Sequence, residues 1–220
     1  MEQDFWLNKW QQGQTGFHQP EGQSLLHEYW PQLELPPSSN ILVPLCGKSR
    51  DMLWLANQGH HVTGIELSDI AAQEFFAEAK LDYQRAQLEY FDCFKSTRIE
   101  IRVGNIFDMP ANELMRFDGF YDRAALIALP KELRQRYVDH LMAGLPSGAI
   151  GLLIAFSYDP ALMSGPPFSV NDEMVGHLYS RFAHVDLLAE RRGLDKSSSL
   201  RKRGLTDKDT RESVYRIVRR

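Results

Sequence analysis

The chain has few cysteines and no pattern that would pair them. Its 220 residues include two, Cys46 and Cys93, without a Cys-x-x-Cys motif. This argues against a disulfide framework and against the usual zinc-binding spacings, and no other metal site is indicated. Long hydrophobic runs are also missing, because the longest, from Ala149 to Phe156, is far shorter than the roughly 20 residues of a membrane-spanning helix. The first residues lack the basic and apolar regions of a signal peptide. We therefore expect a cytoplasmic protein without a membrane partner.

Neither sign of charge dominates the chain, but the charges are unevenly distributed. The formal net charge is −4, yet residues 191–220 carry 11 basic and 4 acidic residues. Such a segment can meet an anionic ligand or a nucleic acid, although a solvated loop is the commoner explanation. We predict a mobile basic loop over 191–211. With 43% hydrophobic and 25% charged residues, the whole chain, 1–220, is expected to form one globular domain.

Strand-like and helix-like segments alternate along the chain. Runs rich in β-branched and aromatic residues predict strands, and segments with apolar residues at helical spacing lie between them. The expected strands are 41–45, 61–66, 99–103, 117–121, 149–156, 184–188 and 213–218. This order predicts an α/β fold: a single, doubly wound, mostly parallel seven-stranded sheet with helices on both faces and an antiparallel last strand. In such sheets, ligands bind at the carboxyl ends of the strands.

A glycine-containing turn and an acidic residue stand at that edge of the sheet. The turn around Gly47 follows the first predicted strand, and Glu66 ends the second. A carboxylate at the end of the second strand, about 20 residues after the turn, is where doubly wound folds bind the ribose of a nucleoside cofactor. The sequence therefore predicts a cofactor that carries a ribose.

Missing glycines narrow the choice of that cofactor. The triplet from Gly47 to Ser49 is similar to the end of a phosphate-binding loop, but that motif needs a glycine at position 42, where the chain has leucine. The three-glycine turn of dinucleotide-binding folds is also absent. S-adenosyl-L-methionine has no phosphate and needs a carboxylate for its ribose, an apolar slot for adenine and an environment for its sulfonium. Glu66 and the Ile106-Phe107 pair suit the first two needs.

Several segments together resemble one known family, the thiopurine S-methyltransferases, particularly their bacterial members. The turn from Val43 to Ser49, which reads Val-Pro-Leu-Cys-Gly-Lys-Ser, departs specifically from the usual glycine-rich methyltransferase turn. The resemblance covers the chain from its first ten residues to about residue 170. It also includes the segments 5–10, 16–18, 51–56, 64–66, 122–126, 157–160 and 165–168.

The resemblance implies a role for individual residues. It assigns residues 1–30 to an N-terminal aromatic lid, although Trp6 and Trp10, at i and i+4, would by spacing alone form a core stripe. The implied cofactor-binding residues are Trp6, Trp10, Leu45, Glu66, Asn105, Ile106 and Arg123. The implied acceptor-binding residues are Phe17, Arg123, Pro167, Phe168 and Arg201, and Arg123 is also the implied catalytic residue.

The resemblance also implies the reaction. The expected activity is transfer of a methyl group from S-adenosyl-L-methionine, which becomes S-adenosyl-L-homocysteine, to an aromatic or heterocyclic thiol such as a thiopurine, with selenium or tellurium compounds as further acceptors. The implied protein is a monomer with a small-molecule substrate and no nucleic acid partner. An RNA or other N-methyltransferase that uses the basic C-terminal segment is the alternative, and a non-catalytic cofactor-binding module is a third hypothesis.

Overall fold

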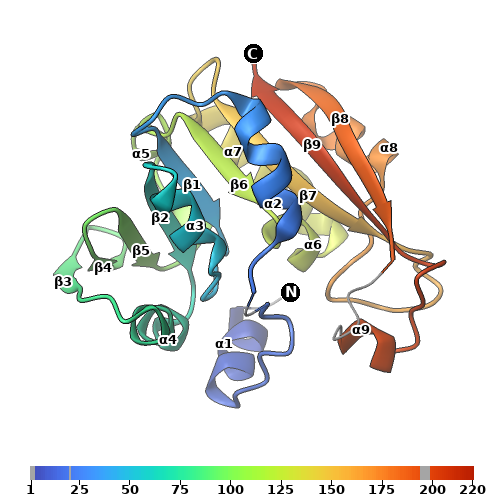
Figure 1. Ribbon diagram of the computed structural model, residues 1–220, viewed down its shortest axis with the longest axis horizontal. Helices are drawn as coiled ribbons and strands as arrows, with labels where there is room; N and C mark the ends of the chain where they lie inside the picture. The colour runs from blue at the N-terminus through green and yellow to red at the C-terminus, as the bar shows by residue number, and fades with distance from the viewer. Residues whose placement is uncertain (1–2, 20, 194–198) are drawn as a thin grey trace.

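A single mixed sheet forms the centre of the molecule (Figure 1). The computed structural model describes residues 3–19, 21–193 and 199–220. In those residues the sheet has nine strands in the order β3-β4-β5-β2-β1-β6-β7-β9-β8. The strands are β1 (Asn40–Pro44), β2 (His61–Glu66), β3 (Gln84–Gln87), β4 (Asp92–Lys95), β5 (Ile99–Val103), β6 (Gly119–Asp122), β7 (Ile150–Ser157), β8 (Ala183–Arg192) and β9 (Arg211–Arg219).

The predicted fold class is confirmed, with one addition. Strands β5, β2, β1, β6 and β7 are parallel, and β9 runs antiparallel between β7 and β8. These seven strands are the seven that the sequence predicts. The hairpin of β3 and β4 extends the sheet beyond β5, again antiparallel. All four side chains of β3 are exposed, so this strand lacks the apolar alternation that would have revealed it.

Helices cover both faces of the sheet. The helices of the described residues are α1 (Gln3–Gln11), α2 (Ser24–Tyr29), α3 (Asp51–Asn57), α4 (Asp69–Ala79), α5 (Ala111–Leu114), α6 (Ala125–Ala128), α7 (Lys131–Gly144), α8 (Asp172–Tyr179) and α9 (Ser199–Lys202), with the 3-10 turns η1 (Trp30–Leu33) and η2 (Ile106–Asp108). No helix among residues 3–19, 21–193 and 199–220 is long and apolar enough to cross a membrane.

The sheet separates two hydrophobic cores. Helices α2, α3 and α4 pack on one face, and α5 to α8 pack on the other. Strand β6 contributes alternately to the two cores, because successive side chains of a strand point to opposite faces. Phe120 therefore lies in the core with α7, and Tyr121 in the core with α2 and α3. Both side chains are fully buried.

The N-terminal residues divide into two parts. Leu25 and Leu26 of α2 are buried against the sheet, so α2 belongs to the core. Helix α1 has a single buried residue, Trp10, and Figure 1 shows it apart from the sheet, below the carboxyl ends of the central strands. Within the predicted lid, 1–30, helix α1 thus lies apart from the sheet and α2 packs on it, and the lid function stays a prediction. The predicted basic loop, 191–211, lies partly outside the described residues.

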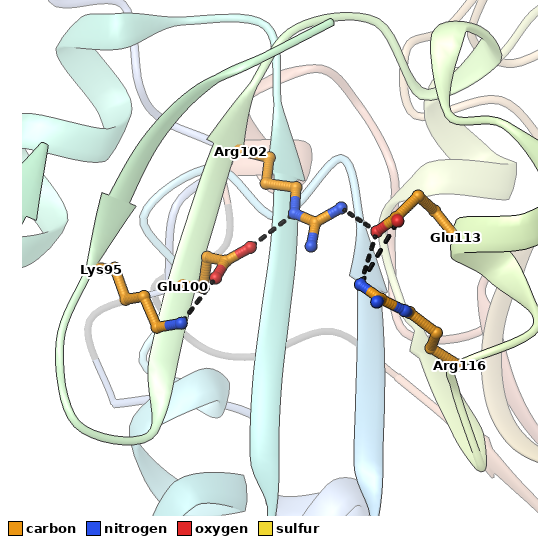
Figure 2. Close-up of polar contacts among 5 residues, drawn as sticks. All are labelled: Lys95, Glu100, Arg102, Glu113 and Arg116. Carbon is orange, nitrogen blue, oxygen red and sulfur yellow. Dashed lines mark hydrogen bonds and ion pairs between the residues drawn. The ribbon is translucent and has the colours of Figure 1, made fainter. Parts of the chain in front are cut away.

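A chain of ion pairs links the edge of the sheet to the segment around α5. Figure 2 shows its side chains, from β4, β5, α5 and the turn after α5, in alternating charge order. Arg102 is central, with Nε 2.5 Å from Glu100 and Nη1 3.1 Å from Glu113. Lys95 lies 3.6 Å from the Glu100 carboxylate, and Arg116 lies 3.3 Å from that of Glu113. Each arginine of this chain therefore has a carboxylate partner.

Candidate active site

The turn after β1 and the last residue of β2 hold each other in place. The Glu66 carboxylate accepts hydrogen bonds from the backbone N–H of Gly47, at 2.8 Å, and of Ser68, at 2.9 Å. Leu45 and Gly47 adopt left-handed backbone conformations, with φ of 49° and 54°. This conformation costs a leucine about 1–2 kcal/mol, so the surrounding contacts must enforce the turn. The predicted pairing of turn and acid is thus a direct contact.

Glu66 is buried without a cationic partner among the described residues. Glu66 is only 7% exposed. Burial raises the pKa of the carboxyl, while the N–H groups of Ser68, Gly47 and Leu67 act in the opposite direction. A carboxylate has about four acceptor positions, and the two hydrogen bonds to Gly47 and Ser68 leave others for ligand hydroxyls. Glu66 can therefore accept hydrogen bonds from a ribose diol.

Three aromatic rings of the N-terminal segment form one cluster beside this turn. The ring of Phe17 makes edge-to-face contacts with Trp6, at 5.4 Å between centroids, and with Trp10, at 5.5 Å. A Cβ atom on Gly47 would lie 3.3 Å from the Trp10 ring, so glycine at this position lets the ring approach the turn closely. We call Trp6, Trp10 and Phe17 the aromatic lid.

Arg123 stands at the carboxyl end of β6 and has no hydrogen bond or ion pair to any described side chain or backbone group that the structure records. Its neighbour Asp122 does not pair with it. The buried Asp122 carboxylate instead accepts from the N–H groups of Ala125 and Leu126 and from the Tyr137 hydroxyl, at 2.7 Å. Burial raises the pKa of Asp122 to about 6. The guanidinium of Arg123 is therefore available to a ligand.

His18 lies near Arg123 and the lysine of the turn. Burial lowers its pKa, and the positive charges of Lys48 and Arg123 lower it further, against the effect of Glu78. Lys48 itself is held by Glu74, at 2.8 Å, and by Glu78, at 2.6 Å. The surroundings of His18 therefore favour the neutral imidazole, and Lys48 is paired with carboxylates of α4.

The loop of Gly165, Pro166 and Pro167 is joined to the C-terminal segment by Arg203. Its guanidinium donates to the carbonyl of Pro166 at 2.5 Å, and the Tyr158 hydroxyl donates to that of Pro167 at 2.6 Å. Arg201, the residue expected near the acceptor, is paired with Asp207 at 2.5 Å. Sequence reasoning missed Arg203, which lies two positions further along the same basic run, where spacing could not separate the two arginines.

One cavity of about 780 Å³ brings most of the predicted residues together. This volume lies within the usual range for small-molecule sites. The predicted residues that line it are Trp6, Trp10, Phe17, Leu45, Glu66, Arg123 and Pro167. Asp51, Tyr121 and Arg203 also line it, and none of them is among the predicted site residues.

Four predicted residues lie outside the cavity wall. Arg201 is one, and Phe168 packs with its ring beside the guanidinium of Arg134. The Asn105 side chain accepts from the Phe107 N–H at 3.1 Å and so caps η2, and Ile106 is buried in the core. The backbone nevertheless keeps Asn105 near the site, because the N–H of Gly104 donates to the Glu66 carbonyl at 2.8 Å.

The cavity residues include no metal centre. Within the part of the chain that the structure describes, no group of three or more histidine, cysteine, aspartate or glutamate side chains is placed to hold a metal ion. Cys46 is buried beside Glu66, and burial, together with the Glu66 charge, raises the pKa of its thiol well above the usual value. The thiol therefore stays protonated and is a poor nucleophile.

Solved structures with the same fold define the class. The chain aligns over 99% of its length with a SAM-dependent methyltransferase from Anabaena variabilis, at a TM-score of 0.67 and 14% identity, covering 95% of that chain. It also aligns over 99% of its length with 86% of the 1,6-didemethyltoxoflavin-N1-methyltransferase of Burkholderia thailandensis, solved with S-adenosylhomocysteine, at a TM-score of 0.65 and 16% identity. The fold is that of the SAM-dependent methyltransferases.

Sequence comparison then defines the family within that class. The family model of thiopurine S-methyltransferase matches residues 1–220. The thiopurine S-methyltransferase of Nitrosomonas eutropha is 47% identical over 219 residues, covering 100% of this chain and 99% of the relative. That of Bordetella petrii is 44% identical, with the same coverage. The chain belongs to the thiopurine S-methyltransferase family, and its activity is SAM-dependent methylation of thiopurines.

Proposed function

We propose that this cavity binds S-adenosyl-L-methionine between Glu66 and the aromatic lid, and the thiol acceptor between Phe17, Arg123 and Pro167. The observation that carries the proposal is the cavity itself, which joins a buried carboxylate, an aromatic cluster and an arginine that has no ion-pair partner among the described residues. These groups come from three separate segments of the chain. Their convergence fits the needs of a ribose, a sulfonium and an anionic acceptor.

The ribose and methionine parts of the cofactor have suitable partners in the cavity wall, and the partners proposed for adenosine lie beside it. The carboxylate of Glu66 accepts from the ribose hydroxyls, and Leu45 covers the methionine part. The faces of Trp6 and Trp10 suit a sulfonium, because a cation over an aromatic ring gains about 0.5–2 kcal/mol. Asn105 and Ile106 are proposed to contact adenosine from the turn after β5, beside the strand that ends on Glu66.

Arg123 is proposed to favour the thiolate form of the acceptor. A nearby positive charge lowers the pKa of a thiol and so supplies the nucleophile. When bound, S-adenosyl-L-methionine supplies its sulfonium methyl group in line to that thiolate and leaves as S-adenosyl-L-homocysteine. Burial keeps the Cys46 thiol protonated and poorly nucleophilic, and the nucleophile in this proposal is the acceptor itself. The lid excludes water, which strengthens the electrostatic effect of Arg123.

The pH dependence of turnover tests the thiolate proposal. We would measure kcat/KM from pH 5 to 9 with two aryl thiols of different pKa. The expected result is that each profile rises toward the pKa of its own acceptor, and that Arg123→Ala lowers kcat/KM most at pH values below that pKa. Identical profiles for both thiols would contradict the proposal, because a protein group would then control the reaction.

The choice of physiological acceptor is a finer part of the proposal. Thiopurines are the acceptors that define the family, and we propose that other heterocyclic thiols, and selenium or tellurium compounds, are also methylated. A methyl-transfer screen with labelled cofactor across aryl thiols, thiopurines, selenite and tellurite measures this. Transfer to RNA with none to thiols would favour the N-methyltransferase alternative. We further propose a cytoplasmic monomer without a nucleic acid partner, which sedimentation and an RNA gel shift test.

A further inference from the structure

The junction between the lid and the body of the protein rests on one buried carboxylate. Helix α1 ends at Gln11 and α2 begins at Ser24, so the chain between them is the covalent link from the lid to the core. The backbone N–H of Gln23, the residue that caps α2, donates to Asp51 Oδ1 at 2.8 Å. The segment therefore enters the core directly above Asp51, and a Cβ atom on Gly22 would lie only 2.9 Å from the same oxygen.

The other oxygen of Asp51 binds the strand that carries Arg123. The Tyr121 hydroxyl donates to Asp51 Oδ2 at 2.9 Å, and Tyr121 lies two positions before Arg123. Asp51 itself is the first residue of α3, directly after the turn that contains Leu45 and Gly47. Asp51 thus joins three parts of the molecule: the lid junction at Gly22 and Gln23, the cofactor turn of Leu45 and Gly47, and the end of β6.

The Asp51 carboxylate is buried and is held by neutral donors. Asp51 is 1% exposed, and both of its recorded partners are neutral donors, with no cation within ion-pair distance among the described residues. Burying a charge without a counter-ion is unfavourable, and an asparagine or an apolar residue would fill the same space. Asp51 and Tyr121 also line the cavity, so the arrangement lies at the site rather than in the remote core.

We propose that Asp51 and Tyr121 act as positioning residues for the reaction: together they fix the lid junction against the cofactor turn, so that the aromatic lid closes over bound cofactor. The proposal rests on the lid function proposed above. It predicts that breaking this pair loosens the lid and weakens cofactor binding more than it destabilises the fold.

The chain offers a matched control for this pair. Tyr137 donates to the buried carboxylate of Asp122 at 2.7 Å, on the opposite face of the sheet. Tyr121→Phe and Tyr137→Phe therefore remove the same hydroxyl from two buried tyrosine–aspartate pairs. Only the first pair contacts the lid junction, because Asp51 accepts from the Gln23 N–H, whereas the recorded donors to Asp122 are Ala125, Leu126 and Tyr137.

Trypsin offers a direct reporter of the lid. Lys9 is the only lysine or arginine before Lys48, so release of residues 1–9 measures opening of α1. In the wild-type protein we expect saturating S-adenosyl-L-homocysteine to slow this cleavage. Asp51→Asn should raise the cleavage rate in the presence of S-adenosyl-L-homocysteine about tenfold and weaken its binding by calorimetry about tenfold, because asparagine cannot accept both hydrogen bonds. Tyr121→Phe should have about a threefold effect on both, since one hydrogen bond to a charged acceptor is lost.

The outcomes separate the two proposals. If S-adenosyl-L-homocysteine does not protect Lys9 in the wild-type protein, the lid function fails, and the inference fails with it. If it protects wild type, Asp51→Asn and both tyrosine variants equally, the lid stands and the positioning role of Asp51 is wrong. If Tyr121→Phe and Tyr137→Phe raise cleavage alike, the effect is one of general stability, and the inference is again wrong. Circular dichroism verifies that each variant is folded. If Asp51→Asn does not fold, Tyr121→Phe, which keeps the aromatic ring, provides the test.

Discussion

Charged side chains have different partners in two regions of the sheet. In the ion-pair chain that links Lys95 to Arg116, shown in Figure 2, cationic and carboxylate side chains alternate, with N···O distances of 2.5–3.6 Å. At the carboxyl ends of the central strands, Glu66 and Asp122 are held by N–H and O–H donors, and Arg123 has no carboxylate partner in the described structure. The charges of the ion-pair chain are neutralised by their neighbours, whereas Glu66 and Arg123, which line the cavity, keep hydrogen-bonding capacity for a ligand.

The pKa values follow from this difference. Burial raises the pKa of Glu66 and of Asp122, because no nearby cation offsets the loss of solvent. A protein tolerates such groups where they serve a function, since each costs stability in the ligand-free state. Variants in the two regions test whether charges at the carboxyl ends of the central strands serve a ligand while those in the ion-pair chain serve stability.

The largest expected effect concerns Asp122 and pH. Its pKa is raised to about 6 from an ordinary 3.8, so the folded state binds the proton more tightly than the unfolded state. The stability contributed by this group is therefore greatest below about pH 4 and is lost as the pH rises through about 6, by on the order of 3 kcal/mol. Denaturant unfolding of wild type and Asp122→Asn from pH 4 to 8 measures it. The wild type should lose stability relative to the variant as pH rises, and a relative gain would show that Asp122 has a stabilising counter-charge.

Arg123→Ala is expected to affect catalysis and leave the fold intact. Loss of a preorganised charge at a reacting group lowers rates by roughly a hundredfold or more, so kcat/KM for an aryl thiol should fall about a hundredfold. The thermal midpoint should stay close to that of wild type, because the guanidinium has no recorded partner to lose. Unchanged kinetics in steady-state assays would make Arg123 a structural residue and end its contrast with Arg102.

Arg102→Ala is expected to do the opposite. It leaves Glu100 and Glu113 without their shared cation, and the side chain of Arg102 is only 12% exposed. Because the pair is partly screened by solvent, we expect a loss of about 2 kcal/mol in the free energy of unfolding. Cofactor affinity and kcat/KM should match wild type. Arg116→Ala, at a side chain that is 68% exposed, is the control and should change stability little. A reduced kcat/KM in Arg102→Ala would blur the distinction between the two regions.

Glu66→Gln is expected to give the smallest of these effects. The amide keeps one acceptor oxygen but places an NH₂ group toward the N–H donors of the turn or toward the ribose. Binding of S-adenosyl-L-homocysteine should weaken about tenfold in calorimetry. Glu100→Gln removes a carboxylate that is paired with arginine, far from the cofactor turn, and should leave binding unchanged. Equal affinities of wild type and Glu66→Gln would contradict the ribose role of Glu66.

Local patterns in the sequence predicted much of the fold. The strands expected at 61–66 and 99–103 have those bounds in the structure, and Ser68 caps α4 by accepting from the Ala71 N–H at 3.3 Å. Such elements are readable because their periodicity and caps lie within a few residues of one another. The β3–β4 hairpin was missed because its outer strand is held by backbone pairing and not by burial.

The sequence by itself determined the family, the parallel sheet, and the position of the Glu66 carboxylate beside the turn, at the edge of the sheet where we propose that ligand binds. It did so because buried strands, turn glycines and the Pro-Leu-Cys-Gly-Lys-Ser segment are local features. Only the tertiary structure decided that Trp10 lies on Gly47, that Arg123 has no ion-pair partner among the described residues, that Arg203 reaches the proline loop, and that Asp51 binds the backbone of Gln23. Those contacts join segments far apart in the chain, and no local spacing encodes which distant side chains will meet.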